Sequence, residues 1–354
     1  MLYTIAKKQS LVGICFAGVQ RLQEQQQCPP EKLYLQWMGM AAKIQQKNEV
    51  LNRQCAELQA KLFDCGMRST ILKGQGIASL YAIKDEGLNI NDLSGLRQSG
   101  DIDVYVDCGR EMALEYARSM QYQVDWDYKH LHLKMFKDTE VEVHYRPEVL
   151  MNLRKNARLQ RWFEEHKEMM FRASTCSGIR TGELVVPSVE FNLFYILLHI
   201  YRHFLFEGVG MRQLMDYYFV LSAYAEHESP RITQILSINT LLKDFGMERF
   251  ASGVMWIMNH VFGMSGQLLL VEPDEKEGRY ILGKVMAGGN FGHHDKRLKD
   301  KKTTGKKRAI KKILKHNLHL LTHYPADTLW APVWIVYHWC WKRMNRRQTN
   351  KYRI

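Results

Sequence analysis

One short segment constrains the fold more than any other part of the chain. From Asp101 to Asp107 the sequence reads DIDVYVD, in which acidic or polar residues alternate with apolar ones. This period of two fits a β-strand and no helix. The sequence before residue 63 and after about residue 150 instead repeats its apolar residues every three to four positions, which predicts helices. We therefore expect an α+β protein, with a small mixed sheet flanked by N-terminal helices and a larger C-terminal helical domain.

The same periodicities divide the chain into segments. We expect an N-terminal helical segment over 1–63 that ends near Gly66, an α/β core over 64–150, a helical domain over 151–287, and a basic loop with a C-terminal aromatic and basic helix over 288–354. In the core, a helix over 111–121 and strands near 129–136 and 139–145 follow the alternating segment. Further helices are expected over 159–170, 189–206, 210–225, 232–244 and 249–262.

The positive charge is concentrated at one end of the chain. The net charge is +13, but residues 291–354 alone hold 17 Lys and Arg against 3 Asp, so the rest of the chain is nearly neutral. A uniformly basic nucleic-acid-binding face is therefore excluded. The lysine-rich run Lys296–Lys315 is interpreted as a solvated segment, with RNA, DNA or an anionic membrane as alternative partners. Nucleic acid is not favoured, because no aromatic residue interleaves with these lysines.

Cysteine usage and hydropathy indicate the compartment. The seven cysteines are odd in number and form no CxxC pair, which argues against a disulfide framework and a thiolate zinc site. A reducing, cytoplasmic location is expected. No apolar run approaches the roughly 18–20 residues that a membrane-spanning helix needs, so we expect no transmembrane segment.

Three motifs in a fixed order carry the chemistry. A glycine turn, Lys73-Gly74-Gln75-Gly76, precedes the pair Asp101 and Asp103, and then come Glu140, Glu142 and His144. Residues two apart on a strand share a face, so the two aspartates converge, and either glutamate could add a third carboxylate from a neighbouring strand. Such carboxylates suit two Mg²⁺ ions and in-line phosphoryl transfer. Backbone N–H groups after Gly74 would face the phosphates.

Each motif alone is weak evidence. A lone DxD is more often solvated alternation on a surface strand, and a lone glycine turn is equally common; their combination in this order favours the functional interpretation. Arg97, four residues before Asp101, would clamp a triphosphate or else be a solvated loop arginine. Lys73 would contact a phosphate or else be a surface charge at a strand end.

With these motifs, the chain resembles the nucleotidyltransferase superfamily that includes DNA polymerase beta and the kanamycin nucleotidyltransferases. It is more closely similar to an uncharacterised bacterial nucleotidyltransferase family with the pattern LKG, then an arginine shortly before DID, then VE-hydrophobic-H. Here these are Leu72-Lys73-Gly74, Arg97 with Asp101-Ile102-Asp103, and Val141-Glu142-Val143-His144. The similarity extends over 197–216 and 324–334. Gln75 departs from the superfamily pattern, in which a second Gly or Ser usually follows the first glycine.

The resemblance implies a magnesium-dependent enzyme that moves NMP from an NTP such as ATP to an acceptor hydroxyl and releases pyrophosphate. It implies that Asp101 and Asp103 bind two Mg²⁺ ions, and it selects Glu142 as third ligand and acceptor-activating base. The nucleotide-binding residues that it implies are Lys73, Gly74, Gln75, Arg97 and Gly100. The acceptor would be a small molecule or a protein. The alternatives are a catalytically silent nucleotide-binding or regulatory protein, and a nucleic-acid-directed enzyme that uses the basic C-terminal segment.

The helical half offers a second set of polar residues. His199 and His203 lie one helical turn apart, and Arg212 and Asp216 follow a Gly-Val-Gly stretch. We interpret the histidines as buried, hydrogen-bonded groups, with a zinc pair as the weaker alternative. A further hypothesis assigns His144, His203, Arg212 and Asp216 to an acceptor pocket. The terminal aromatic helix is expected to dock on the core, with peripheral contact to an anionic membrane as the alternative.

Overall fold

A computed structural model of the chain describes residues 1–24, 27–83, 91–173, 184–227, 232–290 and 318–349. They form two compact units: unit 1 contains Met1–Pro147 and Glu168–Ser188, and unit 2 contains Glu148–Lys167 and Val189–Arg353. Unit 1 combines helices with a five-stranded mixed sheet, so the predicted α+β class is confirmed. The lysine-rich run Lys296–Lys315, the pair His293 and His294, and Cys176 lie outside the described residues.

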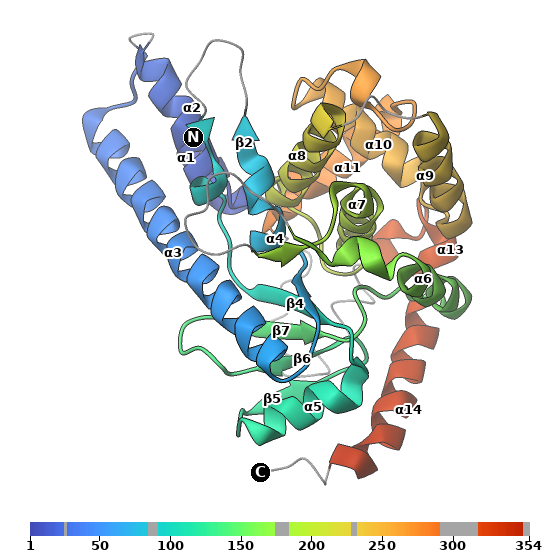
Figure 1. Cartoon of the computed structure of the whole chain (residues 1–354). Helices are drawn as coiled ribbons and strands as arrows, with labels where there is room; N and C mark the ends of the chain where they lie inside the picture. Colours follow the sequence, from blue (N-terminus) through green and yellow to red (C-terminus); the bar gives the residue numbers. More distant parts are fainter. Residues whose placement is uncertain (25–26, 84–90, 174–183, 228–231, 291–317, 350–354) are drawn as a thin grey trace, which may run out of the picture. The chain divides into compact units, whose positions relative to one another are not determined.

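The sheet of unit 1 has the strand order β1-β4-β7-β6-β5 (Figure 1). Its central strands β4 and β7 are parallel, and every other neighbouring pair is antiparallel. The strands are β1 (Ser69–Ile71), β4 (Ile102–Val106), β5 (Val124–Trp126), β6 (His130–Leu133) and β7 (Val141–His144). The expected strands at β4, β6 and β7 are confirmed, whereas β5 has no counterpart in the sequence-based expectation. All five residues of β4 are buried, which fits a strand paired on both edges and covered on both faces.

The long helix α3 (Glu31–Asp64) packs against β1. Its buried residues recur at alternating intervals of four and three, which places them on one stripe of the helix. They are Trp37, Ala41, Ile44, Asn48, Leu51, Cys55, Leu58 and Leu62. The helix ends as predicted at Gly66, whose φ of 73° is left-handed. The N–H of Met67 bonds to the carbonyl of Leu62, and that of Gly66 to the carbonyl of Phe63, which is a Schellman cap.

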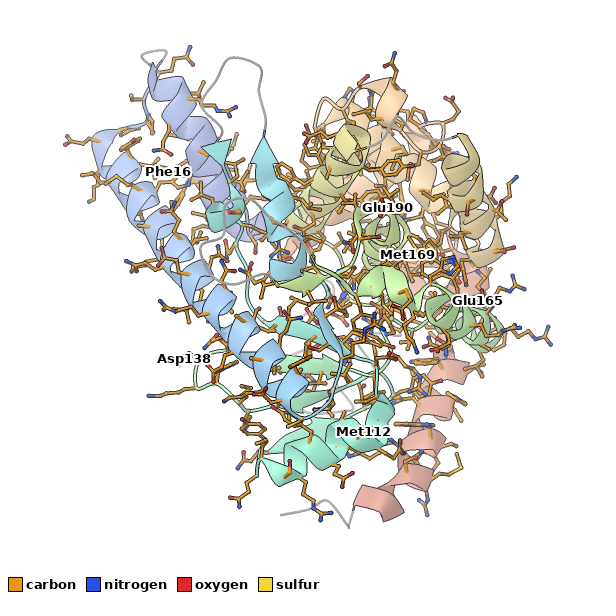
Figure 2. All side chains as sticks on the ribbon, in the orientation of Figure 1. Phe16, Met112, Asp138, Glu165, Met169 and Glu190 are labelled. Atoms are coloured by element: carbon orange, nitrogen blue, oxygen red, sulfur yellow. The ribbon has the colours of Figure 1, made fainter. Side chains whose placement is uncertain are left out.

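Shorter elements complete unit 1. The helices are α1 (Leu2–Gln9), α2 (Val12–Glu24), α4 (Gln75–Ala78) and α5 (Gly109–Ser119), with 3-10 turns η1 (Ser79–Tyr81) and η2 (Ser94–Leu96). Two small hairpins are β2 (Ala82–Ile83) with β3 (Asn91–Asp92) and β8 (Arg172–Ala173) with β9 (Val185–Val186). Asp138 lies in the loop between β6 and β7 (Figure 2), and its carbonyl accepts a hydrogen bond from Lys47 of α3 at 3.1 Å. This hydrogen bond connects α3 to the loop between β6 and β7.

Unit 2 is helical. Its elements are α6 (Leu153–Glu165), α7 (Val189–Phe206), α8 (Met211–His227), α9 (Ile232–Phe245), α10 (Glu248–His260) and α11 (Glu275–Gly288), and the turn η3 (Lys167–Met170) spans the boundary between the units. The helix expected over 159–170 is displaced: α6 begins after Asn152, whose Oδ1 accepts from the N–H groups of Arg154 and Lys155 at 3.1 and 3.2 Å. Gly253 and Gly278 allow α10 and α11 to pack closely, since a Cβ on Gly278 would lie 2.4 Å from the Trp256 ring.

The C-terminal helices α13 (Pro325–Thr328) and α14 (Ala331–Thr349) also belong to unit 2. Asp327 anchors this end, since its carboxylate accepts from Tyr201 of α7 at 2.7 Å and from Lys155 of α6 at 3.1 Å. Along α14, Trp334, Tyr337 and Trp341 are half-buried and Trp339 is exposed. Within the described ranges, no helix combines the length and apolar content that crossing a membrane requires.

Candidate active site

The acidic pair and the third carboxylate meet on neighbouring strands. In the parallel ladder, Asp103 of β4 is the Cα partner of Glu142 of β7. Paired residues on adjacent strands project from the same face, so both carboxylates lie on one side of the sheet. Asp101 stands just before β4 and is exposed, whereas Asp103 is buried. Glu140 is exposed and precedes β7, so the register favours Glu142 as the carboxylate beside the pair.

Asp103 is held by two nitrogen atoms. Lys73 Nζ and His144 Nε2 each lie 2.8 Å from its Oδ1. Burial raises the pKa of Asp103, but Lys73 and His144 outweigh it and hold that pKa well below the usual value. Only 15% of the Lys73 side chain is exposed, so the interpretation of Lys73 as a surface charge is wrong. Asp103 is thus a buried carboxylate that stays ionised.

The other two carboxylates interact with this charge. The negative charge of Asp103, followed by partial desolvation of the carboxyl group, raises the pKa of Asp101, although the residue as a whole is exposed. Burial also raises the pKa of Glu142, but hydrogen bonding to His144, whose Nε2 is 3.3 Å from Oε2, contributes to lowering it to about 2. The repulsion between Asp101 and Asp103 is what a bound cation would relieve.

The glycine turn lies beside the acidic pair. Gly74 adopts a φ of 60°, a conformation that strains other residues. A Cβ placed on it would lie 3.8 Å from the carbonyl oxygen of Asp101 and 4.0 Å from Nη1 of Arg97, so the turn, the arginine and the aspartate are adjacent. Gly76 faces Ile71 so closely that a Cβ would sit 2.2 Å from the carbonyl oxygen. Gly100, just before the pair, is exposed.

Arg97 is buried rather than solvated. Only 2% of the residue is exposed, so its interpretation as a solvated loop arginine is wrong. Its Nη1 donates to Ser99 Oγ at 2.7 Å. Its carbonyl accepts from Asn48 of α3, also at 2.7 Å, and the same amide group bonds to the carbonyl of Gly95. A buried guanidinium beside Gly74 and Asp101 is placed to meet an anion there.

Helix α3 contributes three positions that sequence reasoning missed. Asn48, Asn52 and Cys55 follow one another at helical spacing. Asn52 accepts a hydrogen bond from the side-chain amide of the buried Gln75. Burial and the charge of Asp103 raise the pKa of the Cys55 thiol to about 12, which keeps it neutral. The only sequence signal for Asn48 and Cys55 was their place on the buried stripe of α3, and the half-buried Asn52 lies beside that stripe.

One family comparison bears on the chain as a whole. The pattern of a family described as uncharacterised nucleotidyltransferase matches residues 1–263. The chain belongs to this family. That membership supports transfer of a nucleoside monophosphate as the general activity, with a nucleotide as substrate. The match ends before α11, so the similar segment 324–334 lies beyond it. Comparison with curated proteins gives no match.

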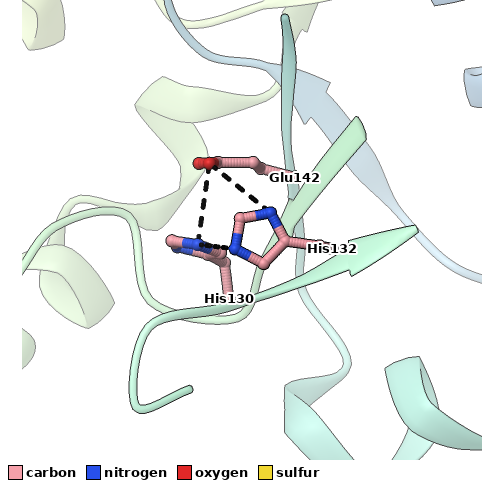
Figure 3. Close-up of side chains that lie close together, drawn as sticks. All are labelled: His130, His132 and Glu142. Atoms are coloured by element: carbon pink, nitrogen blue, oxygen red, sulfur yellow. Dashed lines mark hydrogen bonds and ion pairs between the residues drawn. The ribbon is translucent and has the colours of Figure 1, made fainter. Parts of the chain in front are cut away.

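Two histidines of β6 lie beside the third carboxylate of this nucleotidyltransferase. His132 is the register partner of Glu142, and His130 that of His144. Their Nε2 atoms are 3.1 Å apart (Figure 3). Burial, together with the neighbouring His144, lowers the pKa of His130 to about 3, so its imidazole is neutral at pH 7. The motif HLHL carried the signal for this pair, since alternate strand residues share a face.

The other site residues expected from the sequence of this nucleotidyltransferase, apart from His144, lie in unit 2. His199 Nδ1 contacts the buried Glu148 at 2.9 Å, which confirms a buried, hydrogen-bonded histidine. His203 on α7 and Asp216 on α8 are also buried. Among the described residues, both His, Cys, Asp and Glu groups with metal-binding spacing are in unit 1, and neither contains His199 or His203. His144 lies in unit 1 beside Asp103, and its grouping with His203, Arg212 and Asp216 stays a prediction.

The residues of unit 1 fit a divalent cation. Asp103, Glu142 and His144 bring ligand atoms within 4.8 Å of one another. Mutual repulsion raises the pKa of Asp101, which is the electrostatic signature of carboxylates that gain from a cation. Carboxylate oxygens are the ligands that Mg²⁺ takes in phosphoryl-transfer sites.

Proposed function

We propose that the protein transfers NMP from an NTP, ATP being the first candidate, to an acceptor hydroxyl in a Mg²⁺-dependent reaction. The observation that carries the proposal is the parallel register that puts Asp103 opposite Glu142, with Asp101 two residues before Asp103. In the reaction the acceptor oxygen bonds to the α-phosphorus, and the bond from that phosphorus to the bridging oxygen breaks. Pyrophosphate leaves with the electron pair of that bond.

Asp101, Asp103 and Glu142 would hold two Mg²⁺ ions, which when bound acidify the acceptor hydroxyl and neutralise the triphosphate. Glu142, ionised across the neutral range, accepts the proton of the acceptor hydroxyl. Arg97 and the backbone around Gly74 orient the phosphate oxygens. Gln75 and Gly100 are the further proposed nucleotide contacts, and Lys73 keeps Asp103 ionised.

We further propose a division of labour between the two units. Unit 1 carries the nucleotide chemistry, and unit 2 selects a small-molecule or protein acceptor, with His203, Arg212 and Asp216 among the selecting residues. The near-neutral charge of residues 1–290 supports such an acceptor over a long nucleic acid. A cytoplasmic location is also proposed, supported by free thiols at Cys15, Cys28, Cys55, Cys65, Cys108 and Cys340.

The test is a screen of the four NTPs with Mg²⁺ for thermal stabilisation and for pyrophosphate release with candidate acceptors. An NTP at 100 times its Kd should stabilise the fold by about 2.7 kcal/mol. Asp101→Asn should abolish release while the variant unfolds at or above the wild-type temperature, because it removes one of two repelling carboxylates. NTP binding without turnover for every acceptor class would favour the silent nucleotide-binding alternative. Activity above a few per cent in Asp101→Asn would refute the metal assignment.

A further inference from the structure

A second group of ligand atoms lies on the same sheet face, one strand further from the aspartates. His130 Nε2 and His132 Nε2 are 3.1 Å apart, and Glu142 Oε1 lies 3.7 Å from the first of them (Figure 3). All three residues come from paired positions of the antiparallel β6 and β7. Each supplies one ligand-type atom, and these atoms lie within 4.8 Å of one another.

The spacing matches the edges of a metal coordination polyhedron. A tetrahedral ion with metal–nitrogen bonds of about 2.0–2.1 Å separates its ligand atoms by about 3.3 Å. The 3.1 Å between the two Nε2 atoms is close to that value. Glu142 Oε1 lies 3.7 Å from Nε2 of His130 and 3.8 Å from Nδ1 of His132, so a small rotation of its side chain is needed to complete the set. Backbone pairing fixes the three Cα positions, so this arrangement is built into the sheet.

The carboxylate beside His132 also suits a metal ligand. Glu140 Oε1 lies 2.9 Å from Nδ1 of His132. The two groups are not aligned for a hydrogen bond, but a rotation of the exposed Glu140 side chain would bring its carboxylate to the Nδ1 proton. The lone pair of His132 would then lie on Nε2, the atom that faces His130. A carboxylate in that position orients a metal-bound histidine. Glu140, exposed and outside the acidic pair, is thereby a positioning residue.

We propose that His130, His132 and Glu142 bind one transition-metal ion of the Zn²⁺ class. Two imidazoles and one carboxylate favour such an ion over Mg²⁺, which prefers oxygen ligands. This site is distinct from the Mg²⁺ site proposed at the aspartates, with which it shares only Glu142.

Because Glu142 belongs to both sites, the ion would hold this carboxylate in position. Oε1 of Glu142 lies near Nε2 of His130 and Nδ1 of His132, whereas Oε2 lies 3.3 Å from His144 Nε2, which also contacts Asp103. An ion on Oε1 fixes the carboxylate and leaves Oε2 directed at the nucleotide-transfer centre. The binding site itself stands independently, but this positioning role rests on the proposed function.

The experiment titrates the chelator-treated full chain with Zn²⁺ by calorimetry and with Co²⁺ by its visible absorption, which reports nitrogen coordination. The wild type should bind one equivalent, and excess Mg²⁺ should not displace it. Loss of a supporting carboxylate typically costs 10- to 100-fold in affinity, so Glu140→Gln should weaken Zn²⁺ binding by that factor, and His132→Gln, which removes a ligand, by at least about 100-fold. About a third of the His132 side chain is exposed, so this substitution is compatible with folding, and circular dichroism checks it.

Three further variants make the outcome decisive. His260→Gln changes an exposed histidine of α10 and should bind Zn²⁺ like the wild type. The double variant His293→Gln/His294→Gln removes a histidine pair that could bind metal adventitiously, and it should also retain the site. Asp101→Asn should keep Zn²⁺ binding while losing nucleotidyl transfer, which separates this site from the proposed function.

Three results would overturn the proposal. The first is the absence of saturable Zn²⁺ binding by a folded wild-type chain, in which case the hydrogen bond between the two imidazoles would explain their approach. The second is unchanged Zn²⁺ affinity in folded His132→Gln, and the third is loss of binding in the His293→Gln/His294→Gln variant. Zn²⁺ binding by a chain that transfers no nucleotide would refute the proposed function and support the metal site.

Discussion

Replacing Lys73 by Met tests the electrostatics at the centre of the candidate site. Lys73 Nζ is 2.8 Å from Asp103 Oδ1, and both side chains are largely buried. At an effective dielectric constant of about 20 this pair attracts by about 6 kcal/mol, most of which is offset by desolvation. Breaking a buried pair by removing one partner typically costs about 3–5 kcal/mol. Because His144 still contacts the same oxygen, we expect the lower end, about 3 kcal/mol at pH 7.

The assay is urea-induced unfolding of both chains at pH 7 and at lower pH. Lys73 and His144 hold the pKa of Asp103 below the unfolded value of about 3.9, so the stability they contribute is present above that pH and is lost as the pH falls toward the folded pKa. The deficit of Lys73→Met should therefore shrink below about pH 4. Lys61→Met is the matched control: its ion pair with Glu57 is also 2.8 Å long but exposed, and should contribute about 0.5 kcal/mol or less. Equal losses in the two variants would refute the reasoning.

Two further pairs, each of a variant and its control, test the choice of Glu142 as third carboxylate and the packing of the glycine turn. Glu142→Gln should lower kcat about 1000-fold, because a metal ion supplies several kcal/mol and about 4 kcal/mol is a factor of a thousand in rate. The kcat of Glu140→Gln should stay within about tenfold of the wild-type value. The reverse ranking in a pyrophosphate-release assay would show that the wrong carboxylate was chosen. Gly76→Ala should destabilise the fold by about 1–3 kcal/mol because its Cβ meets the Ile71 carbonyl. Gly18→Ala on α2 has no neighbour within 4 Å and should be neutral or stabilising in the same denaturation measurement, so a similar loss in both would contradict the packing argument.

The sequence predicts the strands of the site well because their period of two is short-range information. The alternation from Asp101 predicts β4, and the acidic alternation before Tyr145 predicts β7. The end of α3 at Gly66 is equally local, since only a residue tolerant of positive φ fits the cap. These features depend on a few neighbouring residues and need no knowledge of the rest of the fold.

Elements without a strong local pattern were missed. The edge strand β5 has three residues, of which only Trp126 is buried, so it carries too little alternation to be recognised. The helix α11 was also not predicted. Its burial depends on close packing of Gly253 against Glu277 and Ile281, a contact between residues more than twenty positions apart.

The environment of the site residues is decided by equally distant contacts. Arg97 is buried, and its carbonyl is bound by Asn48, on a helix that ends long before it in the sequence. Lys73 is withdrawn from the surface by Asp103, which the sequence assigned to metal alone. His130 and His132 become candidate metal ligands only because the antiparallel register places Glu142 beside them. Residue types and spacing therefore predict which groups are available, whereas the pairing of strands decides what each one meets.

The parallel pairing of β4 with β7 also sets the order in which the site is assembled. Asp103 and its partner Glu142 are 39 positions apart, and β5 and β6 are made in between. At a synthesis rate of about 5–20 residues per second, Glu142 is added about 2–8 seconds after Asp103. The hairpin of β6 and β7 is local, whereas joining β4 to it requires closure of a long loop. We therefore expect the two carboxylates to meet late in the formation of the sheet, after the hairpin of β6 and β7.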